Sequence, residues 1–109
     1  MVNYLIRVAY NDADNASIFE RMNTELAKFN VAAALTSDDG KGYYLPAGEY
    51  CYSGAEPISE VRDAIYRLAE SLKPGASVMV MEVSNLAWAG LRQVDAPHFV
   101  VSPAAPAAQ

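Results

Sequence analysis

The sequence has 109 residues, 52% of them hydrophobic, and its 13 acidic side chains outnumber eight basic ones, which gives a formal charge of -5. A chain of this length is expected to form one domain with its own core. The acidic balance disfavours a broad contact with nucleic acid phosphates, because such contacts need clustered Lys and Arg. The single cysteine excludes an intrachain disulfide, and no apolar run approaches the roughly 18 residues of a membrane span. We therefore expect a cytoplasmic protein that is neither exported nor inserted in a membrane.

The first predicted elements are a strand and a helix. Residues 3–10 alternate between two faces, as a half-buried strand requires. After a polar break, Ile18, Met22, Leu26 and Phe29 recur at helical spacing and predict a helix over residues 15–29. The next residue, Asn30, is expected to take the left-handed conformation that often ends a helix.

Two further strands are predicted around a tight turn. Residues 31–36 form a short apolar run that leads into Asp38-Asp39-Gly40, a sequence suited to a hairpin. The returning strand begins at Tyr43 and Tyr44, bends at residues 46–48 and resumes over residues 49–53. Because proline cannot donate a hydrogen bond to a ladder, an irregular strand is expected here.

The second half of the chain predicts a helix and a strand. Pro57 suits the first helical position, and apolar residues then recur every three or four positions until residue 72. Residues 77–84 are apolar on both faces, so this strand is expected inside the sheet. Residues 85–94 suggest a turn followed by a fifth strand or a helical turn that seats Trp88 on the domain. Residues 96–109 are rich in Pro and Ala and predict a flexible tail.

The predicted order β-α-β-β-α-β is that of a ferredoxin-like α+β sandwich over residues 1–95, with two helices on one face of a four-stranded antiparallel sheet. The other face would remain open, although Leu5 and Ala9 of the first strand and apolar residues of the last strand would lie on it. An open apolar face requires a cover. A homodimer, or the segment around Trp88, is expected to provide it.

Several residues have two interpretations, one chemical and one structural. Asp12 and Asp14 follow the first strand, where carboxylates are able to hold Mg²⁺, but helix capping explains them better. Asp38 and Asp39 are also carboxylates able to hold a metal ion, but their place in the hairpin turn explains them better. His98 has no partner for acid-base chemistry and is expected at the surface.

The thiol and the aromatic residues also have plainer explanations. Nothing near Cys51 in the sequence activates it as a nucleophile, so a buried thiol is expected. The tyrosines and Arg7 suit a sheet face on which single-stranded RNA stacks, but too few basic residues flank them, and packing is the preferred interpretation. The sequence has no Gly-rich phosphate loop, serine nucleophile motif or HExxH pattern, and no cofactor or small-molecule substrate is indicated.

Five short segments resemble a family of small bacterial and phage proteins related to GhoS, the antitoxin of type V toxin-antitoxin systems. The most specific part reads L-P-A-G-E-Y over residues 45–50, followed beyond the second helix by V-M-V-M-E-V and W-A-G-L. The resemblance covers about residues 3–94. It implies a ferredoxin-like fold, and for GhoS itself an endoribonuclease activity against the message of the toxin.

What the resemblance implies for this chain is an antitoxin or an RNA-directed regulator. Nuclease-like relatives place a carboxylate at the end of the first strand, whereas this chain has Tyr10-Asn11-Asp12, so that a Mg²⁺ ligand would be Asp12, displaced by one or two residues. If cleavage occurs, Asp12 or Asp14 would hold the metal. The residues expected to contact nucleic acid or a protein partner are Arg7, Arg21, Tyr43, Tyr44, Glu49 and Tyr50.

Two alternatives avoid catalysis altogether. An acidic protein of this size is able to inhibit a host defence complex, such as a CRISPR-type assembly, by occupying its basic nucleic acid groove, as a phage-encoded inhibitor would. The acidic residues available for this are Asp12, Asp14, Asp38, Asp39, Glu56 and Glu60. A small structural or oligomerisation module without a ligand of its own is the other alternative.

Overall fold

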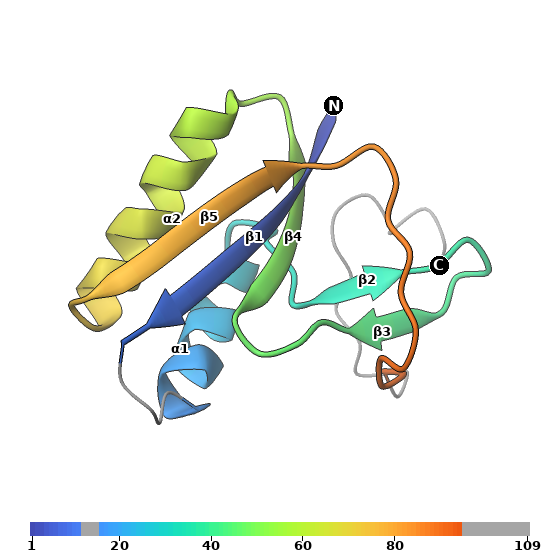
Figure 1. Cartoon of the computed structure of the whole chain (residues 1–109), viewed down its shortest axis with the longest axis horizontal. Helices are drawn as coiled ribbons and strands as arrows, with labels where there is room; N and C mark the ends of the chain where they lie inside the picture. The colour runs from blue at the N-terminus through green and yellow to red at the C-terminus, as the bar shows by residue number, and fades with distance from the viewer. Residues whose placement is uncertain (12–15, 95–109) are drawn as a thin grey trace.

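The computed structural model describes residues 1–11 and 16–94, and shows a small α+β fold (Figure 1). A three-stranded antiparallel sheet in the order β4-β1-β5 carries two helices, and β2 and β3 form a separate two-stranded sheet. The elements are β1 (Val2–Tyr10), α1 (Ala16–Ala27), β2 (Ala34–Thr36), β3 (Gly42–Tyr44), β4 (Glu49–Gly54), α2 (Ile58–Leu72) and β5 (Ala76–Glu82). The order β-α-β-β-β-α-β thus has one strand more than predicted. The segment predicted as a tail lies outside the described residues.

The alternation predicted for the first strand is confirmed in β1, which lies in the centre of the sheet. Tyr4, Ile6, Val8 and Tyr10 are buried on one face, and both helices cover that face. The buried residues of α1 are Met22 and Leu26, and those of α2 are Val61, Ile65 and Ala69. The hydroxyl of Tyr10 donates a hydrogen bond to the carbonyl oxygen of Ala69 at 2.7 Å and so ties the end of β1 to α2.

The predicted third strand is two strands in different sheets, separated at the bend over residues 46–48. Gly48 has a φ of 83° and packs against β1, where the amide of Val8 donates to its carbonyl oxygen at 2.8 Å. A Cβ on Gly48 would lie 2.6 Å from the carbonyl oxygen of Val8. The bend therefore requires glycine for its backbone conformation and for the close approach to β1.

The predicted second strand is mostly absent from the main sheet. Only Ala32 pairs with β4, through reciprocal backbone hydrogen bonds of 2.9 and 2.8 Å with Cys51. Residues 34–36 of this segment form β2 and pair with β3 in the hairpin. The hairpin turn is as predicted, with Gly40 at a φ of 85° and its amide donating to the carbonyl oxygen of Ser37 at 2.9 Å.

The segment over residues 85–94 forms no strand, but it runs along the hairpin (Figure 1). Gln93 makes an isolated bridge with Tyr43, and the amide of Val94 donates to the carbonyl oxygen of Gly42 at 2.9 Å. Trp88 lines a hollow together with Leu5 and Cys51 of the main sheet. The segment therefore borders the face opposite the helices, while Trp88 packs on Tyr43 of the hairpin.

The prediction that the last strand lies inside the sheet is wrong, because β5 is an edge strand. It pairs with β1 along all seven of its residues and has no neighbour on its other side among the described strands. One of its faces packs on the helices through Val78 and Val80, which join the core. On the other face Met79 is 56% exposed, so the apolar composition of the strand is only partly explained by burial.

The helices differ from the prediction in two small respects. Pro57 is the N-cap of α2, one position before the first helical residue. Asn30 has a φ of 65°, as predicted, but α1 ends at Ala27 and leaves Phe29 outside the helix.

Within residues 1–11 and 16–94, neither helix is long and apolar enough to cross a membrane.

Candidate functional site

The charged residues predicted to contact a partner lie on different surfaces. Arg7 of β1 stands opposite Glu49 of β4 on the face away from the helices, and their side chains form an ion pair with an Nη2 to Oε2 distance of 3.6 Å. The Arg7 side chain is 64% exposed. Arg21 is an exposed residue of α1, on the helical side of the sheet. The structure therefore does not combine these two arginines into one phosphate-binding patch.

The three predicted tyrosines already have partners within the molecule. The ring of Tyr43 packs against Trp88 with centroids 5.8 Å apart, and the guanidinium of Arg92 lies 4.2 Å from the ring centroid of Tyr44. Tyr50 is fully buried, and its hydroxyl donates to Oδ1 of Asn23 at 2.7 Å. Burial raises the pKa of Tyr50 well above its ordinary value. Because its ring has no exposed surface, Tyr50 cannot stack with a base or contact a partner.

Asp39 of the hairpin acts as a turn former. Oδ1 of Asp39 accepts hydrogen bonds from the hydroxyl of Ser37 and from the amide of Lys41. The bond from Ser37 is the main cause that lowers the pKa of Asp39 below its ordinary value. Asp12, Asp14 and His98 lie outside the described residues. Among the residues that are described, no three His, Cys, Asp or Glu side chains gather where they could hold a metal ion.

Cys51 is a partly buried thiol in β4. Its Sγ donates to the carbonyl oxygen of Ala34 at 3.1 Å, and burial raises the pKa of the thiol to about 11. A thiol with this pKa is almost entirely protonated near neutral pH and is a poor nucleophile. The prediction that Cys51 is not activated agrees with its surroundings.

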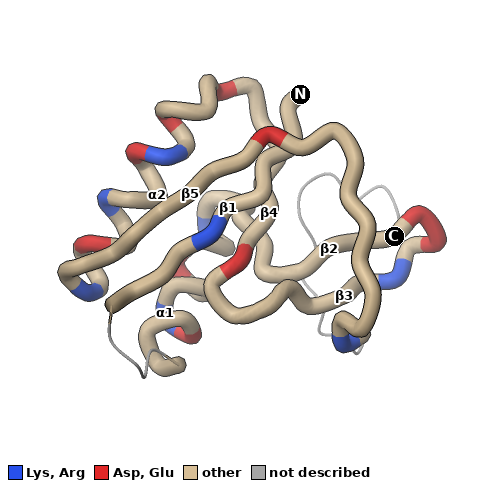
Figure 2. Tube along the Cα trace, viewed as in Figure 1, with Lys and Arg blue, Asp and Glu red and all other residues tan. Residues whose placement is uncertain are grey.

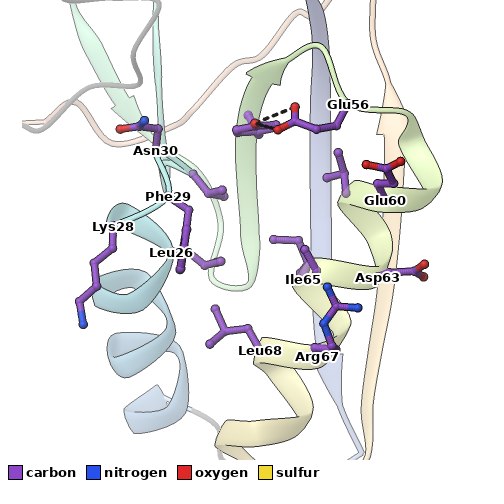
Figure 3. Close-up of a pocket in the computed structure, with 14 residues that line it drawn as sticks. Leu26, Lys28, Phe29, Asn30, Glu56, Glu60, Asp63, Ile65, Arg67 and Leu68 are labelled. Atoms are coloured by element: carbon purple, nitrogen blue, oxygen red, sulfur yellow. Dashed lines mark hydrogen bonds between the residues drawn. The ribbon is translucent and has the colours of Figure 1, made fainter.

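A hollow lies between the two helices, and we call it the helix groove (Figure 3). It encloses about 860 Å³. Leu26 of α1 and Ile65 and Leu68 of α2 point into the space between the helices. The lining residues are Leu26, Lys28, Phe29, Asn30, Val31, Tyr52, Glu56, Glu60, Val61, Asp63, Ala64, Ile65, Arg67 and Leu68.

The end of α1 shapes one wall of the helix groove. After Ala27 the chain turns at Asn30, and the amide of Val31 donates to the carbonyl oxygen of Leu26 at 3.1 Å. This turn places Phe29 at the groove with 65% of its surface exposed. The sequence pattern assigned Phe29 to the core side of a longer helix, so its exposure was missed. The Asn30 signal could not reveal it, because a left-handed residue at this position also agrees with a helix that ends at Phe29.

The rim of the helix groove is acidic at one end. The Tyr52 hydroxyl lies 2.8 and 2.9 Å from the two carboxylate oxygens of Glu56 and donates to that group. This hydrogen bond is the main cause that lowers the pKa of Glu56, so the carboxylate stays ionised near neutral pH. Glu60 stands on the same end of α2 (Figure 3).

The remaining rim charges are partly neutralised by neighbours. Lys28 forms an ion pair with Glu25 at 3.0 Å, and Asp63 forms one with Arg62 at 2.9 Å. Arg67 lies farther along α2 than Glu60 and away from Glu56, which precedes the helix (Figure 3). The groove thus combines an apolar floor with an acidic end that no ion pair to a described residue neutralises.

The chain matches no protein-family model and none of the curated proteins compared with it.

Proposed function

We propose that this protein is a non-enzymatic regulator of the antitoxin or inhibitor type, and that it acts by binding a protein partner in the helix groove. The observation that carries the proposal is the exposure of Phe29 above an apolar floor. A phenylalanine that is 65% exposed beside other apolar side chains leaves surface that a partner would remove from water.

The ferredoxin-like fold and the relationship to GhoS belong to the same proposal. In the strand order β5-β1-β4 the residue Ala32 stands beside β4, where a ferredoxin-like sheet would have its fourth strand. Both helices lie on one face, as that fold requires. The resemblance in residues 45–50 supports the antitoxin-like class, and the lone cysteine suits a cytoplasmic location.

The partner that fits the groove is an amphipathic helix with apolar side chains on one face and Lys or Arg at one end. A helix lying in a groove anchors itself through side chains three and four positions apart. Phe29, Ala64 and Leu68 provide the apolar surface for them. The carboxylates of Glu56 and Glu60 would pair with the basic end, which gives the association a dependence on salt.

The described surface supports a protein partner better than RNA. Tyr50 is buried, while Tyr43 and Tyr44 pack on Trp88 and Arg92. Basic residues alternate with acidic ones along α2, and they form no continuous stripe on the described part of the chain (Figure 2). Base stacking with backbone contacts would need exposed aromatic faces beside clustered cations.

The proposal includes a homodimer formed through the open face of the sheet. Met79 on that face is 56% exposed, and Leu5 and Met81 lie beside it in the register. A second copy would cover this apolar surface, in keeping with the preference of soluble oligomers for two-fold symmetry. The helix groove lies on the opposite face, so the dimer would leave it accessible.

Peptide binding tests the role of the groove. An amphipathic peptide with leucines at helical spacing and lysines at one end is titrated into the protein, and its fluorescence anisotropy is followed. Phe29→Ala is expected to weaken binding about tenfold or more, because burying a phenylalanine contributes about 1.5 kcal/mol or more. Leu86→Ala is the matched control, since Leu86 is also exposed but lies outside the groove. Equal losses in both variants would refute the assignment.

A nuclease assay tests the non-enzymatic part of the proposal. The protein is incubated with a panel of RNAs in the presence of Mg²⁺, and no cleavage is expected. Cleavage by the wild-type protein that disappears in the Asp12→Ala/Asp14→Ala variant would replace the proposal with a metal-dependent endoribonuclease.

A further inference from the structure

The outer edge of β5 has the composition of an interior strand. Its seven residues carry no Pro and no Lys, and their register with β1 continues without a bulge. Natural edge strands are usually protected from pairing with other chains by charges, prolines, bulges or shortness. The only charge in β5 is Glu82 at its end. The edge therefore lacks the ordinary features that prevent strand addition.

The hydrogen-bonding direction of each residue follows from the ladder. The amide of Val83 donates to the carbonyl oxygen of Asn3 at 2.9 Å, so this pair is hydrogen-bonded toward β1. Because antiparallel pairs alternate, Met79 and Met81 also bond toward β1, while Val78 and Val80 direct their amide and carbonyl groups outward. No described residue bonds these outward groups.

The two edges of this sheet differ in how their outward backbone groups are satisfied. On the β4 side the outward groups of Cys51 pair with Ala32. On the β5 side, the first outward amide is the only one with a partner among the described residues, because Ala76 donates to Oε2 of Glu70 at 2.6 Å. An added strand at Val78 and Val80 would satisfy backbone groups that otherwise rely on water.

Helix α2 forms a shelf beside this edge. The outward amide of Ala76 donates to Glu70 at the end of α2, and in the view of Figure 1 the helix runs along β5 on the side away from β1. Tyr66 is one helical turn before Glu70 on the same helix face and is 46% exposed. Met79 is exposed on the opposite face of the sheet. A strand at the edge would lie between these two exposed side chains.

The position of α2 also bears on what the edge is able to accept. Two-fold pairing of β5 with β5 of a second copy would bring a second α2 next to the first at the same seam. A single extended segment brings no second helix. Glu70 and Glu82 stand near opposite ends of the edge, so charge complementarity favours a segment with a basic residue at each end.

We propose that the outer edge of β5, together with Tyr66, binds an extended segment of a partner protein by β-strand addition. The segment has alternating apolar residues in its middle and Lys or Arg at both ends. Its backbone pairs with Val78 and Val80, which supplies affinity, and its side chains on the helix side cover Tyr66, which supplies selectivity. This site is independent of the helix groove.

Amide hydrogen exchange is the decisive measurement. In the free protein the amides of Val78 and Val80 exchange fast, whereas that of Met79 is protected by β1. The probe is a short synthetic peptide with lysine at each end and alternating valine and threonine between them. A saturating amount is expected to slow exchange at Val78 and Val80 by about tenfold or more, as a new backbone hydrogen bond would.

A matched pair of variants separates the backbone from the side chain. Val80→Pro removes the outward donor without touching a bond to β1, and is expected to abolish peptide binding. Val80→Ala shortens the side chain but keeps the amide, and is expected to bind. Amide hydrogen exchange in the wild-type protein tests the proposal even if the Val80→Pro variant fails to fold.

Three results would overturn the proposal. The first is unchanged exchange at Val78 and Val80 with millimolar peptide. The second is protection in the free protein that increases with protein concentration, which would identify a second copy as the occupant. The third is protection in the free protein at every concentration, which would mean that the chain itself covers the edge.

Discussion

The bend before β4 can be tested by a pair of glycine substitutions with the same backbone conformation. Gly48 and Gly40 have φ values of 83° and 85°, so alanine is strained to a similar extent at each. An added Cβ at Gly40 meets no atom within 4 Å. At Gly48 it would lie 2.6 Å from the backbone oxygen of Val8 and 3.2 Å from Phe19. The difference in the free energy of unfolding between the two variants therefore measures the effect of the close approach of the bend to β1.

The expected magnitudes follow from these contacts. Alanine in the left-handed region costs roughly 1 to 2 kcal/mol, which is the whole effect expected for Gly40→Ala. Gly48→Ala adds an overpacking cost of about 1 to 3 kcal/mol, because Val8 belongs to the central strand and cannot move away without disturbing two neighbours. The free energy of unfolding should thus fall by about 2 to 5 kcal/mol.

Urea unfolding followed by far-ultraviolet circular dichroism gives both free energies. The Gly48→Ala midpoint should be clearly lower than that of Gly40→Ala, with similar slopes. In thermal unfolding each kcal/mol corresponds to about 4 °C for a domain of this size. If both variants lose the same stability, the bend is not pressed against β1 and its glycine serves only the turn.

Other predictions concern single side chains and the assembly. Tyr50→Phe should lower the free energy of unfolding by about 1 kcal/mol, because Asn23 is exposed and can bind water instead; a loss above about 3 kcal/mol in urea unfolding would contradict this. The thiol of Cys51 keeps its proton to about pH 11 in the folded protein, whereas the unfolded chain loses it near 9.0, so stability should fall between these values as pH rises, by roughly 2 to 3 kcal/mol from this group. Cys51→Ala should reduce that slope, and an unchanged slope would exclude the thiol as its source. Light scattering should show a dimer that Met79→Asp shifts toward monomer, and a wild-type monomer at tens of micromolar would refute dimerisation through the open face.

Local patterns predicted the elements well and their arrangement less well. The alternation in β1, the apolar spacing of α2 and the conformation of Asn30 follow from short-range chemistry, and the structure has all three. The split of the third strand was visible only as a bend, because residues 46–48 do not show which strand each half will pair with. The helix groove was not predicted, since its shape depends on where α1 stops and how far α2 lies from it.

The position of β5 shows why composition misled the prediction. An apolar pattern on both faces indicates burial on both faces, and it cannot distinguish burial by the same chain from burial by another. In β5 the helices bury one face, whereas Met79 and the outward groups of Val78 and Val80 have no cover among the described residues. If natural selection maintains the apolar composition of an interior strand at this edge, the strand that a partner adds there is the physical reason for it. The disagreement between pattern and structure therefore points to the same surface as the unpaired backbone groups, from independent evidence.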